Sequence, residues 1–327
     1  MTHRIGVIGG DGIGPDVVAE GLKVIAAAGI ELETVNYDLG GARYLRDGVV
    51  LEDETIEEWR ALDALYLGAV GTPEVPPGVI ERGLLLRMRF DLDLYINQRP
   101  FVSTADAIDP FDFTVIRENT EGTYAGEGGF LRRNTPEEIA TQGSVNTRHG
   151  VERCIRYAFE LAQGRAKHLT LVHKTNVLTF SGDLWERTFN EVATQYTDVT
   201  TAYNHVDAAC IYFVEDPTRY DVIVTDNLFG DILSDLGGAI SGGIGFAASA
   251  NLHPGRVSMF EPVHGSAPDI AGTNTANPIA AVISAALMLE HLGEHDAASR
   301  IITACENAKT LKGSTTELGD AIADAVR

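Results

Sequence analysis

The chain has 327 residues, of which 44% are hydrophobic and 22% are charged, which is the composition of a globular protein of about two domains. With 25 Lys and Arg against 47 Asp and Glu, the formal net charge is −22 at pH 7, so nucleic acids and anionic membranes are poor partners. The three cysteines lie far apart and form no CxxC pair. That spacing argues against a disulfide framework and a cysteine-based zinc site, and it fits a reducing compartment.

Export and membrane signals are not expected in this sequence. Arg4 leads directly into a short apolar segment and a glycine-rich turn, without the long apolar stretch of a secretory signal. Two uncharged runs, 236–255 and 270–289, are interrupted by glycine or proline and are too polar to span a bilayer. We therefore expect a cytoplasmic protein.

Short apolar segments alternate with helical patterns along the chain, which predicts an α/β fold. The expected strands are 4–8, 64–67, 113–116, 168–172 and 221–225. The expected helices are 16–28, 181–193, a segment through Asp231 and Asp235, a buried helix at 278–292 and a surface helix at 316–326. The segment 80–94 mixes leucines with arginines, and the polar, glycine-rich stretch 123–147 is either a loop or an extended arm.

A glycine-rich turn, GGDGIGP, separates the first expected strand from the first helix. A G-x-G-x-x-G fingerprint that starts at Gly12 would need a third glycine at position 17, where the chain has Val17. A standard Rossmann dinucleotide fold is therefore not expected. From the residues alone, the turn is either a tight connection that needs positive φ or a loop that faces a ligand.

Two aspartates share one face of the helix that follows strand 221–225. Asp231 and Asp235 are four residues apart, so their negative charges destabilise the helix unless a cation lies between them. Carboxylate ligands favour Mg²⁺ or Mn²⁺ over zinc. Asp226 and Asp207 could supply further oxygens. The alternative is a solvated acidic face.

A lysine and three arginines are candidates for acid–base and carboxylate chemistry. Lys174 follows strand 168–172, and burial or nearby cations would lower its pKa enough for a general base. The guanidinium groups of Arg89, Arg99 and Arg117 match carboxylates bidentately, which suits a di- or tricarboxylate substrate. Each of the four could instead be a surface residue.

The segment 261–278, EPVHGSAPDIAGTNTANP, is rich in small residues that let a backbone approach a ligand closely. It carries His264, Asp269 and Asn277. The Asp269 carboxylate would accept hydrogen bonds from ribose hydroxyls and repel a 2′-phosphate, which favours NAD over NADP if a dinucleotide binds here. The alternative is a plain connection between helices.

Seven segments, in chain order, resemble the β-decarboxylating dehydrogenases, the family of isopropylmalate, isocitrate, homoisocitrate and tartrate dehydrogenases. They are GDGIGPDV, LGAVG, INQRP, RENTEGTY, HKTNVL, TDNLFGDILSDL and EPVHGSAPDIAG, and they cover nearly the whole chain. The resemblance implies the isopropylmalate dehydrogenase-like two-domain α/β fold. A discontinuous cofactor-binding domain would comprise 1–99 and 239–327. An inserted domain, 100–238, would hold the dimer interface, the arm and the metal-site helix.

The resemblance implies NAD-dependent oxidative decarboxylation of a 3-substituted malate by a homodimer with shared active sites. Lys174, donated across the dimer, would take the proton of the C2 hydroxyl, and Tyr124 would protonate the product carbon. Asp231 and Asp235 would bind Mg²⁺ or Mn²⁺, and Asp207, a catalytic residue as well as a metal ligand, would reach that ion from the other subunit. The arm would interlock with its partner.

The same resemblance implies two sets of binding residues. Those that would hold the malate carboxylates are Arg89, Arg99 and Arg117. Those that would bind NAD, with Glu81 near the nicotinamide end, are Glu81, His264, Gly265, Ser266, Ala267, Asp269, Ile270 and Asn277.

The expected side chain of the substrate is inferred from a run of leucines. Leu84 and Leu85, with Leu86, favour an apolar substituent because each buried methylene contributes about 0.8 kcal/mol. This pattern is similar to the isopropylmalate members and implies conversion of 3-isopropylmalate to 2-oxoisocaproate in leucine biosynthesis. The alternative is the same chemistry on isocitrate, homoisocitrate, tartrate or another substituted malate. Three features depart from the family pattern: Gln98 beside Arg99, and the short segments 101–112 and 251–258.

Overall fold

The computed structural model describes residues 2–104 and 107–327, and the chain divides into two compact units. The first unit comprises Met1–Leu94, Arg99–Pro110 and Gly238–Arg327, and the second comprises Tyr95–Gln98 and Phe111–Gly237. Strand β4 (Ile96–Val102) passes from the second unit into the first. This division places Arg99–Pro110 with the terminal segments, whereas the family resemblance assigned 100–238 to the inserted domain. Two residues of the short segment 101–112, at positions 105 and 106, lie outside the described residues.

The first unit is built on a mostly parallel sheet in the order β2-β1-β3-β12-β11. Its strands are β1 (His3–Gly10), β2 (Leu32–Asn36), β3 (Ala64–Ala69), β11 (Ala248–Leu252) and β12 (Ser258–Pro262). β1 is parallel to β2 and β3, β3 is parallel to β12, and β11 pairs with β12 in antiparallel register. The predicted strands 4–8 and 64–67 are confirmed as parts of β1 and β3.

The helices of this unit pack their apolar faces on the sheet and on one another. They are α1 (Gly14–Ala27), α2 (Gly41–Asp47), α3 (Asp53–Trp59), α4 (Arg87–Asp91), α9 (Ile279–His291), α10 (His295–Ala308) and α11 (Thr315–Val326). The expected buried helix is α9, which contacts α1, α10, β11 and β12 and is therefore apolar on nearly every side. The expected surface helix is α11, whose inner face packs on α1 and α10 and whose start carries a capping box between Ser314 and Glu317.

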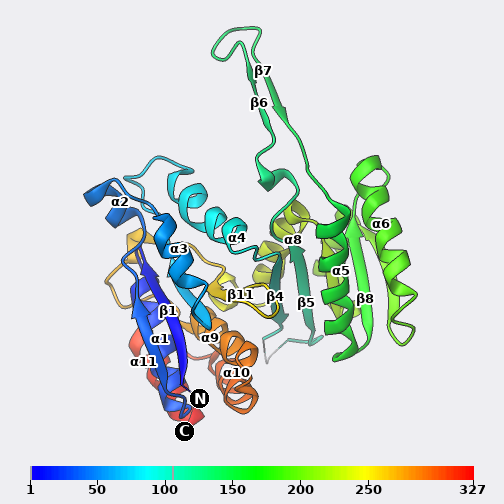
Figure 1. Ribbon diagram of the computed structural model, residues 1–327. Coiled ribbons are helices and arrows are strands. Elements are labelled where there is room, and N and C mark those ends of the chain that lie inside the picture. Colours follow the sequence, from blue (N-terminus) through cyan, green and yellow to red (C-terminus); the bar gives the residue numbers. More distant parts are fainter. Residues whose placement is uncertain (1, 105–106) are drawn as a thin grey trace. The chain divides into compact units, whose positions relative to one another are not determined.

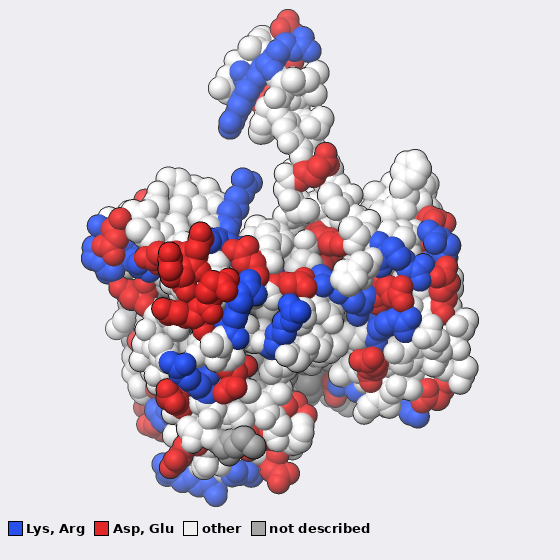
Figure 2. Space-filling view, in the orientation of Figure 1, with Lys and Arg blue, Asp and Glu red and all other residues white. Residues whose placement is uncertain are grey.

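Much of the negative charge lies on solvated faces. Figure 2 shows acidic side chains gathered over α3, where Asp53, Glu54, Glu57 and Glu58 are all exposed. Among the described residues, no helix is both long enough and apolar enough to cross a membrane.

The second unit contains four parallel strands in the order β5-β10-β8-β9. They are β5 (Asp112–Glu118), β8 (His168–His173), β9 (Thr200–His205) and β10 (Val222–Thr225). The helices are α5 (Arg148–Gln163), α6 (Thr179–Ala193), α7 (Val206–Glu215) and α8 (Asn227–Ile240). Helix α5 packs across β5, β10 and β8 and contacts α6. The predicted strands at 113–116, 168–172 and 221–225 and the helix at 181–193 are confirmed.

The stretch 123–147 forms an extended arm, which decides between the two alternatives for that segment. Its strands β6 (Gly128–Leu131) and β7 (Ile139–Gln142) pair in antiparallel register and are exposed along their whole length. Figure 1 shows this hairpin extending away from the sheet of its own unit. Figure 2 shows basic side chains at its tip, where Arg132 and Arg133 form part of the turn.

Candidate active site

The candidate residues of the second unit lie at one edge of its sheet. Arg117 is near the carboxyl end of β5, Lys174 follows β8, and Asp207 lies at the start of α7, directly after β9. Asp231 lies on α8, which follows β10. Because the four strands are parallel, all these positions lie at the carboxyl-terminal edge, where open α/β sheets bind their ligands.

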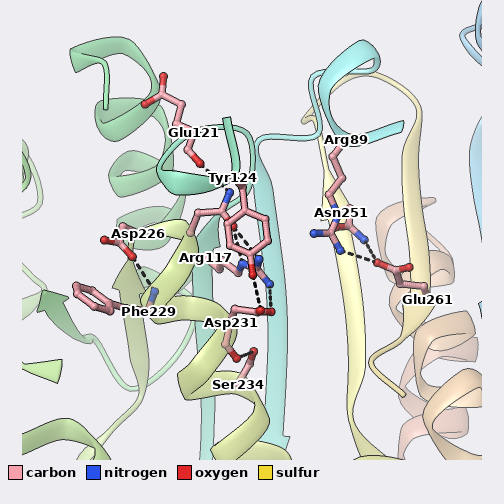
Figure 3. Close-up of polar contacts among 11 residues, drawn as sticks. Arg89, Arg117, Glu121, Tyr124, Asp226, Phe229, Asp231, Ser234, Asn251 and Glu261 are labelled. Carbon is pink, nitrogen blue, oxygen red and sulfur yellow. Dashed lines mark hydrogen bonds and ion pairs between the residues drawn. The ribbon is translucent and has the colours of Figure 1, made fainter. Parts of the chain in front are cut away.

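One cluster joins Arg117, Tyr124 and Asp231 (Figure 3). The Tyr124 hydroxyl donates a hydrogen bond of 2.6 Å to Asp231 Oδ2, while the Arg117 guanidinium forms an ion pair with Asp231 Oδ1. Arg117 also donates two hydrogen bonds, of 3.0 and 2.7 Å, to the side-chain oxygen of Asn227. The Arg117 side chain is 1% exposed, so its charge is held in one orientation at the edge of the sheet.

The first turns of helix α8 leave room for the Arg117 side chain. Asp226 occupies the N-cap position, and its Oδ1 accepts a hydrogen bond of 2.8 Å from the backbone N–H of Phe229. Its Oδ2 lies 3.3 Å from Nε2 of the fully buried His173. A Cβ atom at Gly230 would lie 2.5 Å from Cγ of Arg117, so glycine is required for the arginine to cross the helix. Asp226 therefore caps the helix, a role that its sequence position did not reveal.

A second cluster joins Lys174 to Asp207. Lys174 Nζ lies 2.5 Å from Asp207 Oδ1, and this hydrogen bond lowers the pKa of the Asp207 carboxyl below its usual value. The Asp207 side chain is 68% exposed, and Asp235 on α8 is also exposed. Within the described part of the chain, no three His, Cys, Asp or Glu side chains gather as a metal site. Asp231 and Asp235 lie four residues apart on α8, and both carboxylate oxygens of Asp231 are engaged by Tyr124 and Arg117 in this conformation.

In the first unit, the glycine-rich turn is joined to the segment 261–278. Gly10 and Gly12 have φ of 78° and 59°, and a Cβ on Gly12 would lie 2.0 Å from the carbonyl oxygen of Ser266. Ile13 N donates a hydrogen bond of 2.8 Å to that oxygen. The expectation of a tight turn with positive φ is confirmed, and the same turn contacts the segment proposed to face a ligand.

Asp11 holds this region together and was missed from the sequence, although it lies inside the GDGIGPDV motif. Its carboxylate accepts hydrogen bonds from the backbone N–H groups of Gly41, Ala42 and Gly71, at 2.7, 3.0 and 2.8 Å. The side chain thus ties the turn after β1 to the turn after β3 and to the start of α2. Like the segment 263–278 after β12, both turns follow carboxyl ends of parallel strands.

The segment after β12 offers an unsatisfied polar atom. His264 Nδ1 lies 3.0 Å from the carbonyl oxygen of Gly265, which assigns the proton to Nδ1 and leaves Nε2 as an acceptor. His264 Nε2 is buried and has no hydrogen-bond partner among the described residues, and burial lowers the pKa of the imidazole. A buried acceptor of this kind fits an amino donor such as that of adenine. Asp269, five residues further along the segment, is exposed.

The remaining cofactor candidates differ in their burial and in their local contacts. Ser266 is buried, and Ala267 has a φ of 39°. Asn277 accepts a hydrogen bond of 2.9 Å from Ile279 N, the first residue of α9, through its side-chain oxygen. Glu81 is exposed and accepts a hydrogen bond of 2.8 Å from Gly78 N.

The leucine run forms a π-helical turn, Glu81–Leu86, which leads directly into α4. Leu84 is completely buried in the core of the first unit, and Leu85 is partly buried against the same core. Leu86 is half-exposed. A side chain without accessible surface contacts no ligand in this conformation, so the accessible apolar groups of the run are Leu85 and Leu86.

The two remaining arginine candidates are buried on the first unit. Arg89 forms an ion pair of 3.3 Å with Glu261, whose Oε1 also accepts a hydrogen bond of 2.8 Å from Asn251 (Figure 3). Arg99 is 5% exposed on β4. Sequence reasoning missed Asn227 and Glu261 as partners of the arginines, although both lie within the motifs TDNLFGDILSDL and EPVHGSAPDIAG.

Gln98 has a structural partner. Its side-chain oxygen accepts a hydrogen bond of 2.6 Å from the hydroxyl of Tyr157 on α5. Successive side chains of a strand point to opposite faces, so Gln98 and Arg99 on β4 face opposite ways. The departure from the family pattern is thus matched by a tyrosine on a neighbouring helix.

Comparison with known proteins identifies relatives over nearly the whole chain. A sequence model of the isocitrate/isopropylmalate dehydrogenase family matches residues 4–325. The 3-isopropylmalate dehydrogenase of Corynebacterium diphtheriae is 57% identical over 337 residues, covering 99% of each chain. That of Mycobacterium tuberculosis is 54% identical over 335 residues, covering 99% of this chain and 100% of its own.

Two solved structures are similar over nearly their whole length. The isocitrate dehydrogenase of Methylococcus capsulatus superposes with a TM-score of 0.92 at 39% identity, with 100% of both chains covered. A β-decarboxylating dehydrogenase from Thermococcus kodakarensis superposes with a TM-score of 0.83 at 35% identity, with 99% of this chain and 96% of its own covered. The chain belongs to the isocitrate/isopropylmalate dehydrogenase family of decarboxylating dehydrogenases.

Proposed function

We propose that this enzyme oxidises 3-isopropylmalate with NAD and decarboxylates it to 2-oxoisocaproate, a step of leucine biosynthesis. The observation that carries the proposal is the cluster in which Tyr124 and the buried Arg117 share the carboxylate of Asp231. It combines a proton donor, a carboxylate-binding cation and a metal-binding oxygen within one hydrogen-bond network. The relatives named 3-isopropylmalate dehydrogenase, at 54–57% identity, support the choice of substrate.

The proposed carboxylate-binding residues are Arg89, Arg99 and Arg117, all nearly buried and therefore fixed in orientation. Leu85 and Leu86 are the accessible members of the leucine run, and we assign contact with the isopropyl group to them rather than to the fully buried Leu84. Two methyl groups against these leucines would contribute roughly 1–2 kcal/mol toward 3-isopropylmalate over unsubstituted malate.

The acid–base steps follow from the two clusters of the second unit. Lys174 is the proposed base, and it takes the proton of the C2 hydroxyl while the hydrogen on C2 leaves with its electron pair. Loss of CO₂ leaves the electron pair at C3, and the Tyr124 hydroxyl donates the proton that completes the product. One proton is removed and one is returned, so the net change is one hydride transferred and one CO₂ released.

Two bound groups complete the proposal. NAD, when bound, accepts the hydride; the residues that would hold it are Glu81, His264, Gly265, Ser266, Ala267, Asp269, Ile270 and Asn277. The buried, unpartnered acceptor of His264 and the exposed carboxylate of Asp269 fit its adenosine part. A bound Mg²⁺ or Mn²⁺ supplies Lewis acidity toward the oxygen on C2. Asp231 and Asp235 would hold the metal ion, with Asp207 from a second copy of the chain.

A homodimer with shared sites accounts for several surface features. Helix α7, which begins beside Asp207, exposes Ile211 and Val214, and α8 exposes Ile232. The arm exposes Phe130 and Leu131. These exposed apolar side chains support an interface with a second copy of the chain, because α7 and α8 also carry the proposed shared residues. Free cysteines at 154, 210 and 305 fit a cytoplasmic location.

The test of the proposal is NADH formation from 3-isopropylmalate with Mn²⁺ and NAD, beside isocitrate, homoisocitrate, tartrate and malate at equal concentrations. We expect 3-isopropylmalate to have the highest kcat/KM, by at least tenfold. A Lys174→Met enzyme controls for contaminating dehydrogenases and should be inactive. Preference for another acid would retain the reaction type and refute the assignment of substrate. No turnover of any of the five would refute the proposed function.

A further inference from the structure

A single hydroxyl group binds the backbone on both sides of Lys174. The hydroxyl of Tyr203 lies 3.1 Å from Thr175 N and 3.2 Å from the carbonyl oxygen of His173. It also lies 2.8 Å from Nδ1 of His205 and 3.0 Å from the hydroxyl of Thr175. A tyrosine hydroxyl donates once and accepts twice. Donation to the carbonyl oxygen of His173 and acceptance from Thr175 N bind the hydroxyl to the backbone on both sides of Lys174, with His205 Nδ1 and the Thr175 hydroxyl as further neighbours within hydrogen-bond distance.

The position of Tyr203 in the sheet explains how it reaches this point. Tyr203 pairs with Leu171 in the parallel register of β8 and β9, and His205 pairs with His173 at the end of both strands. Regular pairing therefore stops one residue before Lys174. Beyond it, residues 176–180 are all exposed. Where the hydrogen bonds between the strands end, the Tyr203 hydroxyl binds the backbone of the residues before and after Lys174.

The same contacts reach the residue that pairs with Lys174. His205 occupies the N-cap position of α7, two residues before Asp207. Its ring packs edge-on against the Tyr203 ring, with centroids 5.1 Å apart. Tyr203 and His205 thus link the strand end that carries Lys174 to the helix start that carries Asp207. The Nζ–Oδ1 distance of 2.5 Å between those two side chains depends on both backbones being held in place.

We propose that Tyr203 is a positioning residue for the catalytic lysine, with His205 as its second contact. The proposal rests on the proposed role of Lys174 as the base. A general base must lie within hydrogen-bond reach of the proton that it removes, and a misplacement of about 1 Å can reduce the rate by about 100-fold. The alternative is that the Tyr203 ring only packs against its neighbours and that its hydroxyl has no part in the reaction.

Substitution Tyr203→Phe separates these cases because it retains the ring and removes the hydroxyl. Tyr220→Phe is the matched control: the Tyr220 hydroxyl donates a hydrogen bond of 2.9 Å to Asn204 on the same strand, and its ring packs against Phe113 and Phe213. Both variants are made in the full-length enzyme. Their melting temperatures are compared first, and we expect similar small decreases.

Kinetics on the best malate substrate are then measured with hydrogen and with deuterium at C2. For Tyr203→Phe we expect kcat to fall at least tenfold, about 1.4 kcal/mol, with KM within twofold of the wild type. The deuterium isotope effect on kcat should rise because the chemical step becomes slower. For Tyr220→Phe we expect unchanged kinetics. A Tyr203→Phe enzyme with the kcat and isotope effect of the control would overturn the proposal.

A second measurement is independent of turnover. The Thr175 amide donates to the Tyr203 hydroxyl, so its hydrogen exchange should accelerate in Tyr203→Phe and not in Tyr220→Phe. If the wild type turns over no malate, the proposed function fails, and the exchange measurement still decides whether the hydroxyl holds this backbone. Equal exchange in both variants would overturn the positioning role whatever the activity.

Discussion

Substitution Gly230→Ala should stabilise an isolated helix but impair the enzyme. A Cβ at this position would lie 2.5 and 2.6 Å from Cγ and Cβ of Arg117, whereas ordinary contacts begin at 3.4 Å. The arginine would have to move by about 0.9 Å, the difference between 3.4 and 2.5 Å. Arg117 is fully buried and bound to both Asn227 and Asp231, so this shift would disturb the whole cluster.

Two opposing effects determine the stability of the Gly230→Ala variant. Replacing glycine by alanine within a helix contributes about 1 kcal/mol of stability, whereas overpacking a filled site costs about 1–3 kcal/mol. The free energy of unfolding should therefore fall by about 0–2 kcal/mol. Displacing a substrate-binding group by about 1 Å should lower kcat/KM by about 10- to 100-fold.

Gly238 on the same helix provides the control. A Cβ there would meet its nearest neighbour, Cβ of Ala247, at 3.5 Å, which is an ordinary contact. Gly238→Ala should keep the wild-type kcat/KM and have equal or greater stability. Both variants are assayed for NADH formation at saturating NAD and for unfolding by urea. Wild-type kcat/KM in Gly230→Ala would show that Arg117 does not require its observed position.

Two further predictions concern buried polar groups of the second unit. Burial raises the pKa of Glu118 from 4.5 to about 7, so its contribution to stability is complete below pH 4.5 and is lost as the pH rises through 7. Between pH 5 and 8 the wild type should lose about 3 kcal/mol more unfolding free energy than Glu118→Gln, measured in urea; parallel pH profiles would contradict this. Gln98→Leu should cost about 1 kcal/mol because the Tyr157 hydroxyl loses its partner, and the preference for 3-isopropylmalate over isocitrate should not change. A changed preference would show that Gln98 contacts the substrate.

The fold class followed from the sequence because its signals are local. Alternating apolar strands and helices predicted β1, β3, β5, β8 and β10 and the helices α1, α6, α8, α9 and α11, whereas α2, α3, α5, α7 and α10 were not predicted. Strand β9, which has two exposed residues followed by four half-buried ones, and the short β2 lack a buried apolar run and were not predicted. Hydrophobic periodicity and turn residues are local features of the sequence. A strand without a clear periodicity can therefore be recognised only from its pairing in the sheet.

The candidate residues of the site could be identified from the sequence because they lie within motifs. Their contacts could not be predicted. Asp231 and Tyr124 are 107 positions apart in the chain, and only the parallel order of β5 and β10 brings them together. The same holds for Lys174 and Asp207, which the pairing of β8 with β9 joins. Spacing within a helix predicted a shared face for Asp231 and Asp235, but it could not reveal that Arg117 lies against that face.

What the sequence by itself determined is therefore local: strands, helices, a glycine turn with positive φ, and the residue types from which the proposed carboxylate, metal and NAD sites are drawn. Only the tertiary structure decided which of the candidate side chains are accessible and which have a partner. It buried Leu84 in the core while leaving Leu86 half-exposed, and it paired Gln98 with Tyr157. The physical reason is that burial and hydrogen-bond partners depend on packing between segments distant in the chain, and no local pattern encodes which side chain a neighbouring element will cover.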